Sequence, residues 1–138
     1  MFFESLREGI EIHKKVKFEE KQINFYINLS RDKNSIHGGP NPVVPGILIL
    51  FKIAGLVSQK FADKSMVTEI VSSKFKRPLF LKQNAFIILR IKKKGLVHNG
   101  RGTIILDIHI RNNRNKLLFV GNSKVRVPLR QTTAIVAK

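Results

Sequence analysis

The feature that most constrains the fold is one long apolar segment near the middle of the chain, GILILFKIAGLVSQKFA, which begins directly after Pro45. Proline is favoured in the first turn of a helix, where its missing N–H costs no hydrogen bond. The segment is apolar on nearly every side, which is typical of a helix enclosed by other elements. The longest apolar run, 42–57, contains Lys52 and Gly55 and falls short of the roughly eighteen apolar residues of a membrane span. We therefore predict a buried helix and no membrane span.

The segments around this helix have the patterns of strands and of one shorter helix. Residues 10–18 alternate between apolar and polar side chains, which is the two-residue period of a half-buried strand. Residues 19–30 change to spacings of three and four and predict a short helix. Four further strand-like segments, separated by turn clusters such as HNGRG and RNNRN, cover 66–75, 85–93, 103–111 and 117–127.

This order of elements predicts the fold class. The 138 residues, 43% of them hydrophobic, suit one domain with an apolar core, which we assign to 1–138. Four strands in series favour an antiparallel sheet. Because no second helical layer exists to cover the apolar helix, the sheet must wrap it. We therefore expect an α+β domain.

Charge and composition narrow the class of partner without selecting one. The net charge is +17, with 26 Lys and Arg against 9 Asp and Glu, and such a field attracts nucleic acid, anionic lipid, acyl carrier protein or coenzyme A. There is no cysteine, which excludes disulfides, cysteine zinc sites and thiol nucleophiles. His13, His98 and His109 each stand without other ligands at metal-binding spacing, so we expect no metal site. The N-terminus has no secretory signal pattern, and a cytoplasmic location is expected.

A loop of turn-forming residues, 31–45, precedes the apolar helix and contains Asp32 and, five positions later, His37. A carboxylate and an imidazole so placed can converge on one small volume. Such a pair can move protons near neutral pH, because the Asp can orient the His and hold its tautomer. On spacing alone, a turn-forming Asp and a solvated His remain the alternative.

Two resemblances to known families meet on this loop. The segment FEEKQINFYINLSRDKNSIHG resembles the entry segment of MaoC-like and R-specific enoyl hydratases, whose motif is Asp-x-Asn-Pro-x-His; here Ser35 replaces the Pro. The following HGGPNPVVPGIL resembles the signature of bacterial β-hydroxyacyl-ACP dehydratases. That second family has a catalytic Glu five residues after the Gly of Pro-Gly, and this chain has Phe51 there. The loop therefore resembles a composite that keeps the MaoC-like carboxylate, Asp32, and the His that both families share.

The resemblance implies a hot-dog fold, a curved antiparallel sheet around a central helix, and a hydro-lyase without a cofactor. The expected reaction interconverts (R)-3-hydroxyacyl and trans-2-enoyl thioesters of acyl carrier protein or coenzyme A in fatty-acid metabolism. Asp32 and His37 would be the acid–base pair, in an order left open. Gly46 would offer its N–H to the thioester oxygen, and Asn34 would bind substrate or brace the loop. A homodimer or a dimer of dimers is expected.

Three other functions remain open from the sequence. A thioesterase on the same fold would also use a carboxylate and a helix-end amide. A non-catalytic hot-dog protein that only binds acyl chains is the next alternative, because Ser35 and the short loop depart from both families. Nucleic-acid binding suits the positive charge, but the ten Phe are not interleaved with Lys and Arg as stacking platforms. Several basic residues could contact the phosphates of a pantetheine carrier or simply form a solvated face: Lys76, Arg77, Lys82 and Lys92 to Lys94.

Overall fold

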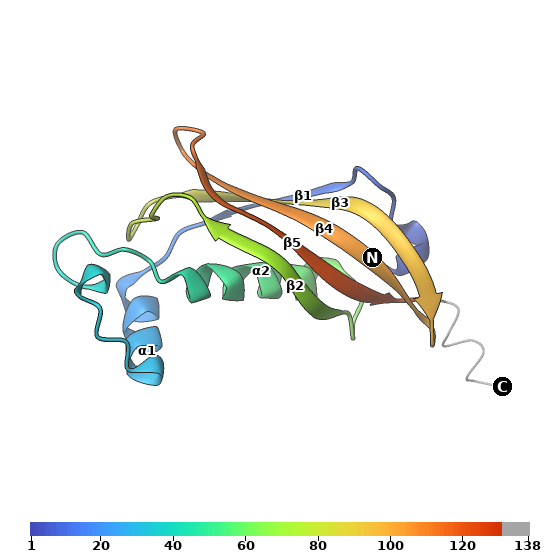
Figure 1. Ribbon diagram of the computed structural model, residues 1–138, viewed down its shortest axis with the longest axis horizontal. Coiled ribbons are helices and arrows are strands. Elements are labelled where there is room, and N and C mark those ends of the chain that lie inside the picture. The colour runs from blue at the N-terminus through green and yellow to red at the C-terminus, as the bar shows by residue number, and fades with distance from the viewer. Residues whose placement is uncertain (131–138) are drawn as a thin grey trace.

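Helix α2, Gly46–Lys60, lies under a five-stranded antiparallel sheet that curves over it (Figure 1). This is a computed structural model, and it describes residues 1–130. The last eight residues of the predicted domain, 131–138, lie outside the described residues. The curved sheet around one long helix confirms the predicted α+β class.

The elements follow the predicted order closely. The strands are β1 Glu11–Val16, β2 Met66–Phe75, β3 Ala85–His98, β4 Arg101–Asn112 and β5 Leu117–Pro128. The helices are α1 Glu20–Ser30 and α2, with two short 3₁₀ turns, η1 Phe3–Ser5 and η2 Ser35–His37. The strands β3 and β4 run a few residues beyond their predicted ends, because their pairing continues from Val97 and Gly102 up to the tight turn between them.

The order of strands across the sheet is β1-β3-β4-β5-β2. Strands β3, β4 and β5 are neighbours in sequence and in space, whereas β2 crosses to the far edge and pairs with β5. Two register shifts interrupt the β2–β5 ladder, between Val67 and Glu69 and between Ile70 and Ser72, and shifts of this kind bend and twist a strand. The two edges of the sheet are therefore β1 and β2.

The core lies between the concave face of the sheet and one face of α2. Fully buried side chains of β3, β4 and β5 alternate with more exposed ones, as the two-residue period of a strand requires. These strand side chains share the core with the buried side chains of α2, which are Leu48, Ile49, Ile53, Leu56 and Val57.

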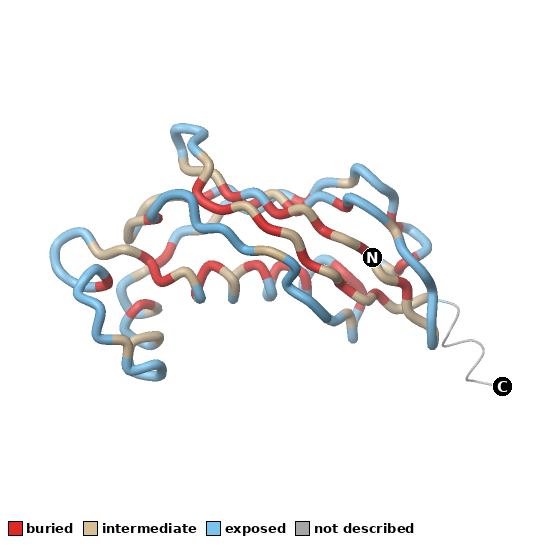
Figure 2. Tube along the Cα trace, viewed as in Figure 1, coloured by how far each residue is buried: buried red, intermediate tan, exposed pale blue. Residues whose placement is uncertain are grey.

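The opposite face of α2 is open, which corrects the prediction of a helix enclosed on nearly every side. Ile47 is 41% exposed and Phe51 is 54% exposed, and Figure 2 shows buried and exposed residues alternating along α2. The physical reason is that one curved sheet covers only one side of a helix. No helix within residues 1–130 is long and apolar enough to cross a bilayer.

Candidate active site

The end of helix α1 places the carboxylate of Asp32. Arg31 ends the helix in the left-handed conformation, with φ of 59°, and its N–H donates to the carbonyl of Ile27 at 2.8 Å. The chain then turns sharply, and the N–H of Asn34 donates to Asp32 Oδ1 at 2.9 Å. This bond closes the side-chain-to-backbone turn that Asp favours. One carboxylate oxygen is thereby fixed by the backbone.

The other oxygen of Asp32 accepts a hydrogen bond from Tyr26, whose hydroxyl lies 2.7 Å from Oδ2. The Asn34 N–H and then the Tyr26 hydroxyl hold the pKa of Asp32 below its usual value of 3.8, because both stabilise the carboxylate. The same bond to Asp32, together with burial, raises the pKa of Tyr26 above its usual value of 10.0. At neutral pH, therefore, Asp32 is ionised and Tyr26 keeps its proton.

The loop also fixes the orientation of His37, which is 9% exposed. Asn34 begins η2 by accepting the N–H of Ile36 at 3.2 Å on its side-chain oxygen. His37 Nδ1 lies 2.7 Å from the carbonyl oxygen of Val43. A carbonyl can only accept, so Nδ1 carries a proton, and in the neutral ring Nε2 is then the unprotonated nitrogen. The carbonyl of Val43 therefore selects the tautomer of His37.

Nε2 of His37 faces Asp32 Oδ2 across 3.4 Å. With the ring neutral, both atoms are acceptors and cannot bond to each other. A water or hydroxyl group that donates to them would resolve the contact, and so would a proton held by Nε2. The pair is therefore arranged to accept a proton from a molecule beside it and to return one.

A cavity of about 400 Å³ opens beside His37 and is lined by His37, Gly46, Phe75, Lys76 and Arg77, among others. The N–H of Gly46, at the start of α2, has no acceptor within residues 1–130, and it carries the positive end of the helix dipole. A Cβ at position 46 would lie 2.7 Å from Cζ of Phe75, so only glycine fits this contact without a shift of the ring. The cavity thus holds the imidazole, a free amide donor and two cations.

A second, apolar cavity of about 270 Å³ lies between α2 and strands β2, β4 and β5. Its lining includes Ile47, Ala54, Val57, Val67 and Ile70. Phe51, which stands where the dehydratase signature has its Glu, also lines this cavity. Space for an apolar chain therefore lies along α2, and Gly46, the first residue of the same helix, lines the His37 cavity.

The structure brings together the two predicted catalytic residues, and it places Gly46 in the same cavity as His37. Asn34 is exposed, and its side-chain oxygen accepts the N–H of Ile36, a contact that braces the loop. Contact of Asn34 with a substrate stays a prediction. Sequence reasoning missed Tyr26 and the carbonyl of Val43. A signal for the first existed, because Tyr26 is the only tyrosine of the chain and precedes Asp32 by six residues. A backbone carbonyl leaves no signal in a sequence.

Neither a protein-family model nor a curated protein sequence matches this chain. Solved structures do match. An (R)-hydratase from A. caviae involved in PHA biosynthesis is 22% identical, with a TM-score of 0.77 over 90% of this chain and 98% of that one. The R-hydratase PhaJ1 from Pseudomonas aeruginosa is 15% identical, with a TM-score of 0.81 over 94% and 86%. The MaoC-like dehydratase from Rhodospirillum rubrum is 14% identical, with a TM-score of 0.77 over 94% and 98%.

The chain has the hot-dog fold. These three structures are of R-hydratases and a MaoC-like dehydratase, the families whose entry segment the loop resembles, so the fold expected from that resemblance is confirmed. At identities of 14 to 22% the match establishes the hot-dog fold, and the reaction is argued from Asp32 and His37.

Tyr26→Phe is expected to raise the pKa of Asp32 towards 3.8, because it removes one of the two bonds that stabilise the carboxylate. A lowered carboxyl pKa stabilises the fold above pH 3.8, and this contribution is lost as the pH falls through the lower folded value. The variant should therefore lose its pH-dependent stability at a higher pH. Titration of the Asp32 carboxyl carbon by NMR measures the change. An unchanged pKa would show that Tyr26 contributes nothing to the state of Asp32.

Proposed function

We propose that this protein is a hydro-lyase that interconverts (R)-3-hydroxyacyl and trans-2-enoyl thioesters. The observation that carries the proposal is the pair of acceptors, His37 Nε2 and Asp32 Oδ2, which face each other across 3.4 Å, with His37 lining a cavity. Addition of water to an enoyl thioester needs such a pair, because one water must be both held and deprotonated. The (R)-hydratases that share the fold support the choice of reaction.

In the direction of hydration, the water donates to both Asp32 and His37. As its oxygen bonds to the β-carbon, its proton passes to Nε2 of His37, and the imidazolium then protonates the α-carbon. Asp32 stays ionised because its pKa is held below the usual value, and its charge stabilises the imidazolium. His37 is thus both base and acid, and Asp32 orients the water and stabilises the charge.

Negative charge develops on the thioester oxygen while the α-carbon is enolate-like. The free N–H of Gly46 and the positive end of the α2 dipole lie at this cavity and can stabilise this charge. The acyl chain would then extend into the apolar cavity between α2 and β2. The carrier would leave past Lys76 and Arg77, whose charges suit the phosphate of a pantetheine arm.

The test is a hydration assay of the purified protein with crotonyl-coenzyme A and with crotonyl acyl carrier protein. We expect loss of the enoyl absorbance and formation of the (R)-3-hydroxyacyl product on at least one carrier. Release of free thiol is followed in the same reactions. Thiol release without hydration would instead identify a thioesterase, and no turnover of either carrier would overturn the proposal.

We also propose that strand β2 joins two copies of the chain into a dimer. Nine of its ten residues are exposed, and Figure 2 shows this edge mostly in the colour of exposed residues. The exposed side chains include Met66, Val67, Ile70, Val71 and Phe75, each 40 to 54% accessible. An unpaired apolar edge strand is a template for a second strand. A partner at this edge would also cover the apolar cavity, which Val67 and Ile70 line.

Val71→Lys is expected to shift the protein from dimer to monomer, because a lysine on an apolar strand edge opposes pairing. Val71 lines none of the cavities described above. The matched control is Leu96→Lys, which adds the same side chain at a residue that is 87% exposed on β3. Sedimentation equilibrium measures the mass. A wild-type monomer, or equal dissociation in both variants, would contradict pairing through β2.

A further inference from the structure

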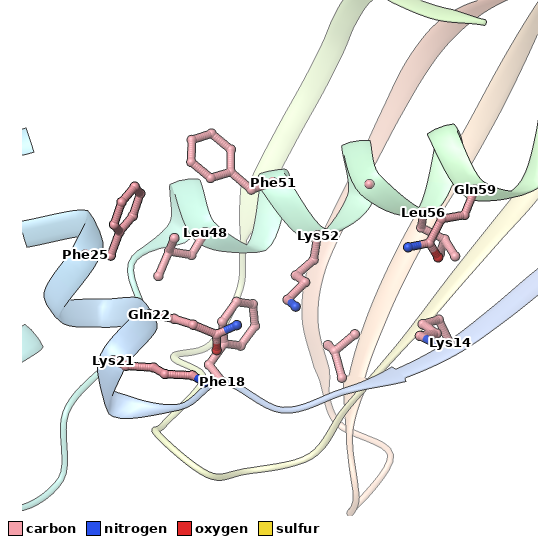
Figure 3. A pocket seen from close by; sticks show the side chains of 12 residues that line it. Lys14, Phe18, Lys21, Gln22, Phe25, Leu48, Phe51, Lys52, Leu56 and Gln59 are labelled. Carbon is pink, nitrogen blue, oxygen red and sulfur yellow. The ribbon is translucent and has the colours of Figure 1, made fainter. Parts of the chain in front are cut away.

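A third cavity, of about 690 Å³, lies between α1, α2 and β1, on the side of α2 that faces away from the β2 edge (Figure 3). Its apolar lining includes Phe18, Phe25, Leu48 and Leu56. A volume of this size is typical of small-molecule sites. Phe25, which lines this cavity, is 65% exposed and is therefore not part of the buried core.

A lysine of the apolar helix α2 points into this cavity. Figure 3 shows the ammonium group of Lys52 between α2 and the ring of Phe18, with Nζ 5.8 Å from the ring centroid. Lys14 and Lys21 line the same cavity, and no Asp or Glu does. Within the described residues 1–130, no carboxylate lies within ion-pair distance of these three lysines. The cavity is therefore lined by three lysines and no carboxylate, and none of the three lysines is in an ion pair within the described residues.

Lys52 is half-buried on a helix that packs against the core, and no carboxylate in residues 1–130 forms an ion pair with it. An apolar residue at position 52 would suit a helix that only fills the fold. An anion bound inside the cavity would balance the charge, and the apolar walls on both sides of Lys52 suit a hydrocarbon chain attached to that anion. The positive charge and the apolar lining together indicate that the ligand is an amphiphile with one negatively charged head group.

We propose that this cavity binds a free fatty acid, with its carboxylate on Lys52 and its chain along Leu48 and Phe25. The site is separate from the proposed active site, since it shares no lining residue with the cavity of His37. It shares only Phe51 with the apolar cavity on the β2 side of α2. The protein would therefore hold a fatty acid on one side of α2 while the other side remains open to a thioester.

The test is calorimetric titration of the full chain with sodium decanoate below its micellar concentration. Lys52→Met is expected to weaken decanoate binding by roughly tenfold to hundredfold, because a charge-assisted hydrogen bond is lost. The same variant should keep its affinity for decanol, because decanol has no carboxylate that could pair with Lys52. Lys92→Met, which removes an exposed lysine of β3 outside the cavity, is the matched control and should bind decanoate as the wild type does.

A second variant fills the cavity without touching the charge. A Cβ at Gly55 meets no atom within 4 Å, and Gly55 lines the cavity, so Gly55→Leu should block both decanoate and decanol. Its thermal stability should not fall, because leucine is a better helix former than glycine. Lengthening the ligand from octanoate to decanoate should tighten wild-type binding about tenfold for the two added CH₂ groups.

Two results would overturn the proposal. One is the absence of decanoate binding by the wild type. The other is binding that survives in both Lys52→Met and Gly55→Leu, since this would place the ligand in another cavity. Both measurements are made without a thioester, so their outcome does not depend on whether the protein has hydratase activity.

Discussion

Asp32→Asn is expected to lower kcat for hydration of a short trans-2-enoyl thioester by roughly 10² to 10⁴. Asparagine keeps the oxygen that accepts the N–H of Asn34, so the turn after α1 is retained. It removes the negative charge opposite His37 Nε2 and turns one acceptor into a donor. The variant should therefore fold normally and fail to hold the water between the two side chains. Because that interaction is made in the transition state, KM should change less than kcat.

His37→Asn is expected to reduce kcat to a similar degree. The shorter amide can still donate to the carbonyl of Val43, 2.7 Å from Nδ1 in the native protein, but it has no group at the position of Nε2. Asparagine therefore keeps a polar side chain at the buried position and removes Nε2, the atom that transfers the proton. The double variant should be little worse than either single one, because residues that act as one unit are not additive.

Matched controls separate these effects from general loss of charge or of histidine. Asp63→Asn removes an exposed carboxylate from the turn after α2, and His13→Asn removes an exposed imidazole on β1. Both controls should retain wild-type rates. Wild-type rates in Asp32→Asn or in His37→Asn would remove the acid–base pair from the mechanism.

Leu89→Ala is expected to lower the free energy of unfolding by about 2 to 5 kcal/mol, the usual cost of emptying a buried leucine site. Leu89 is fully buried at 0% exposure. It lies in the centre of β3, opposite Ile12 on β1 and Ile108 on β4. Neighbours held in a sheet on both sides cannot close around the missing side chain, which favours the upper part of the range. Urea denaturation at one fixed chain concentration measures the change, because dimerisation would make stability depend on concentration.

Leu96→Ala makes the same substitution at a residue that is 87% exposed and should change the free energy of unfolding by less than about 0.5 kcal/mol. The two variants differ only in burial. Equal losses would show that β3 is not packed as the structure describes.

The element order followed from local patterns in the chain. The alternation of 10–18, the helical spacing of 19–30 and the apolar segment after Pro45 became β1, α1 and α2. Such periods are set by the backbone geometry of each element alone, so neighbours along the chain are enough to show them. The same holds for the loop of Asp32 and His37, because turn formers act within a few residues.

The strand order did not follow in the same way. Four strands in series suggested an antiparallel sheet, but β2 pairs with β5 across about fifty residues and leaves an apolar edge. Pairing between distant strands depends on which faces become buried together, and no local period encodes that. The open face of α2 has the same origin, since its exposure depends on where the sheet ends.

For this protein, the sequence by itself determined the elements, the α+β class and the short loop that carries a carboxylate and an imidazole. Only the tertiary structure decided the state of that pair. The hydroxyl of Tyr26 stabilises the Asp32 carboxylate, the carbonyl of Val43 selects the His37 tautomer, and Lys52 reaches a cavity on the far side of α2. The reason is physical: residue types and local periods are properties of the chain, whereas hydrogen-bond partners and uncompensated charges are properties of groups that folding brings together.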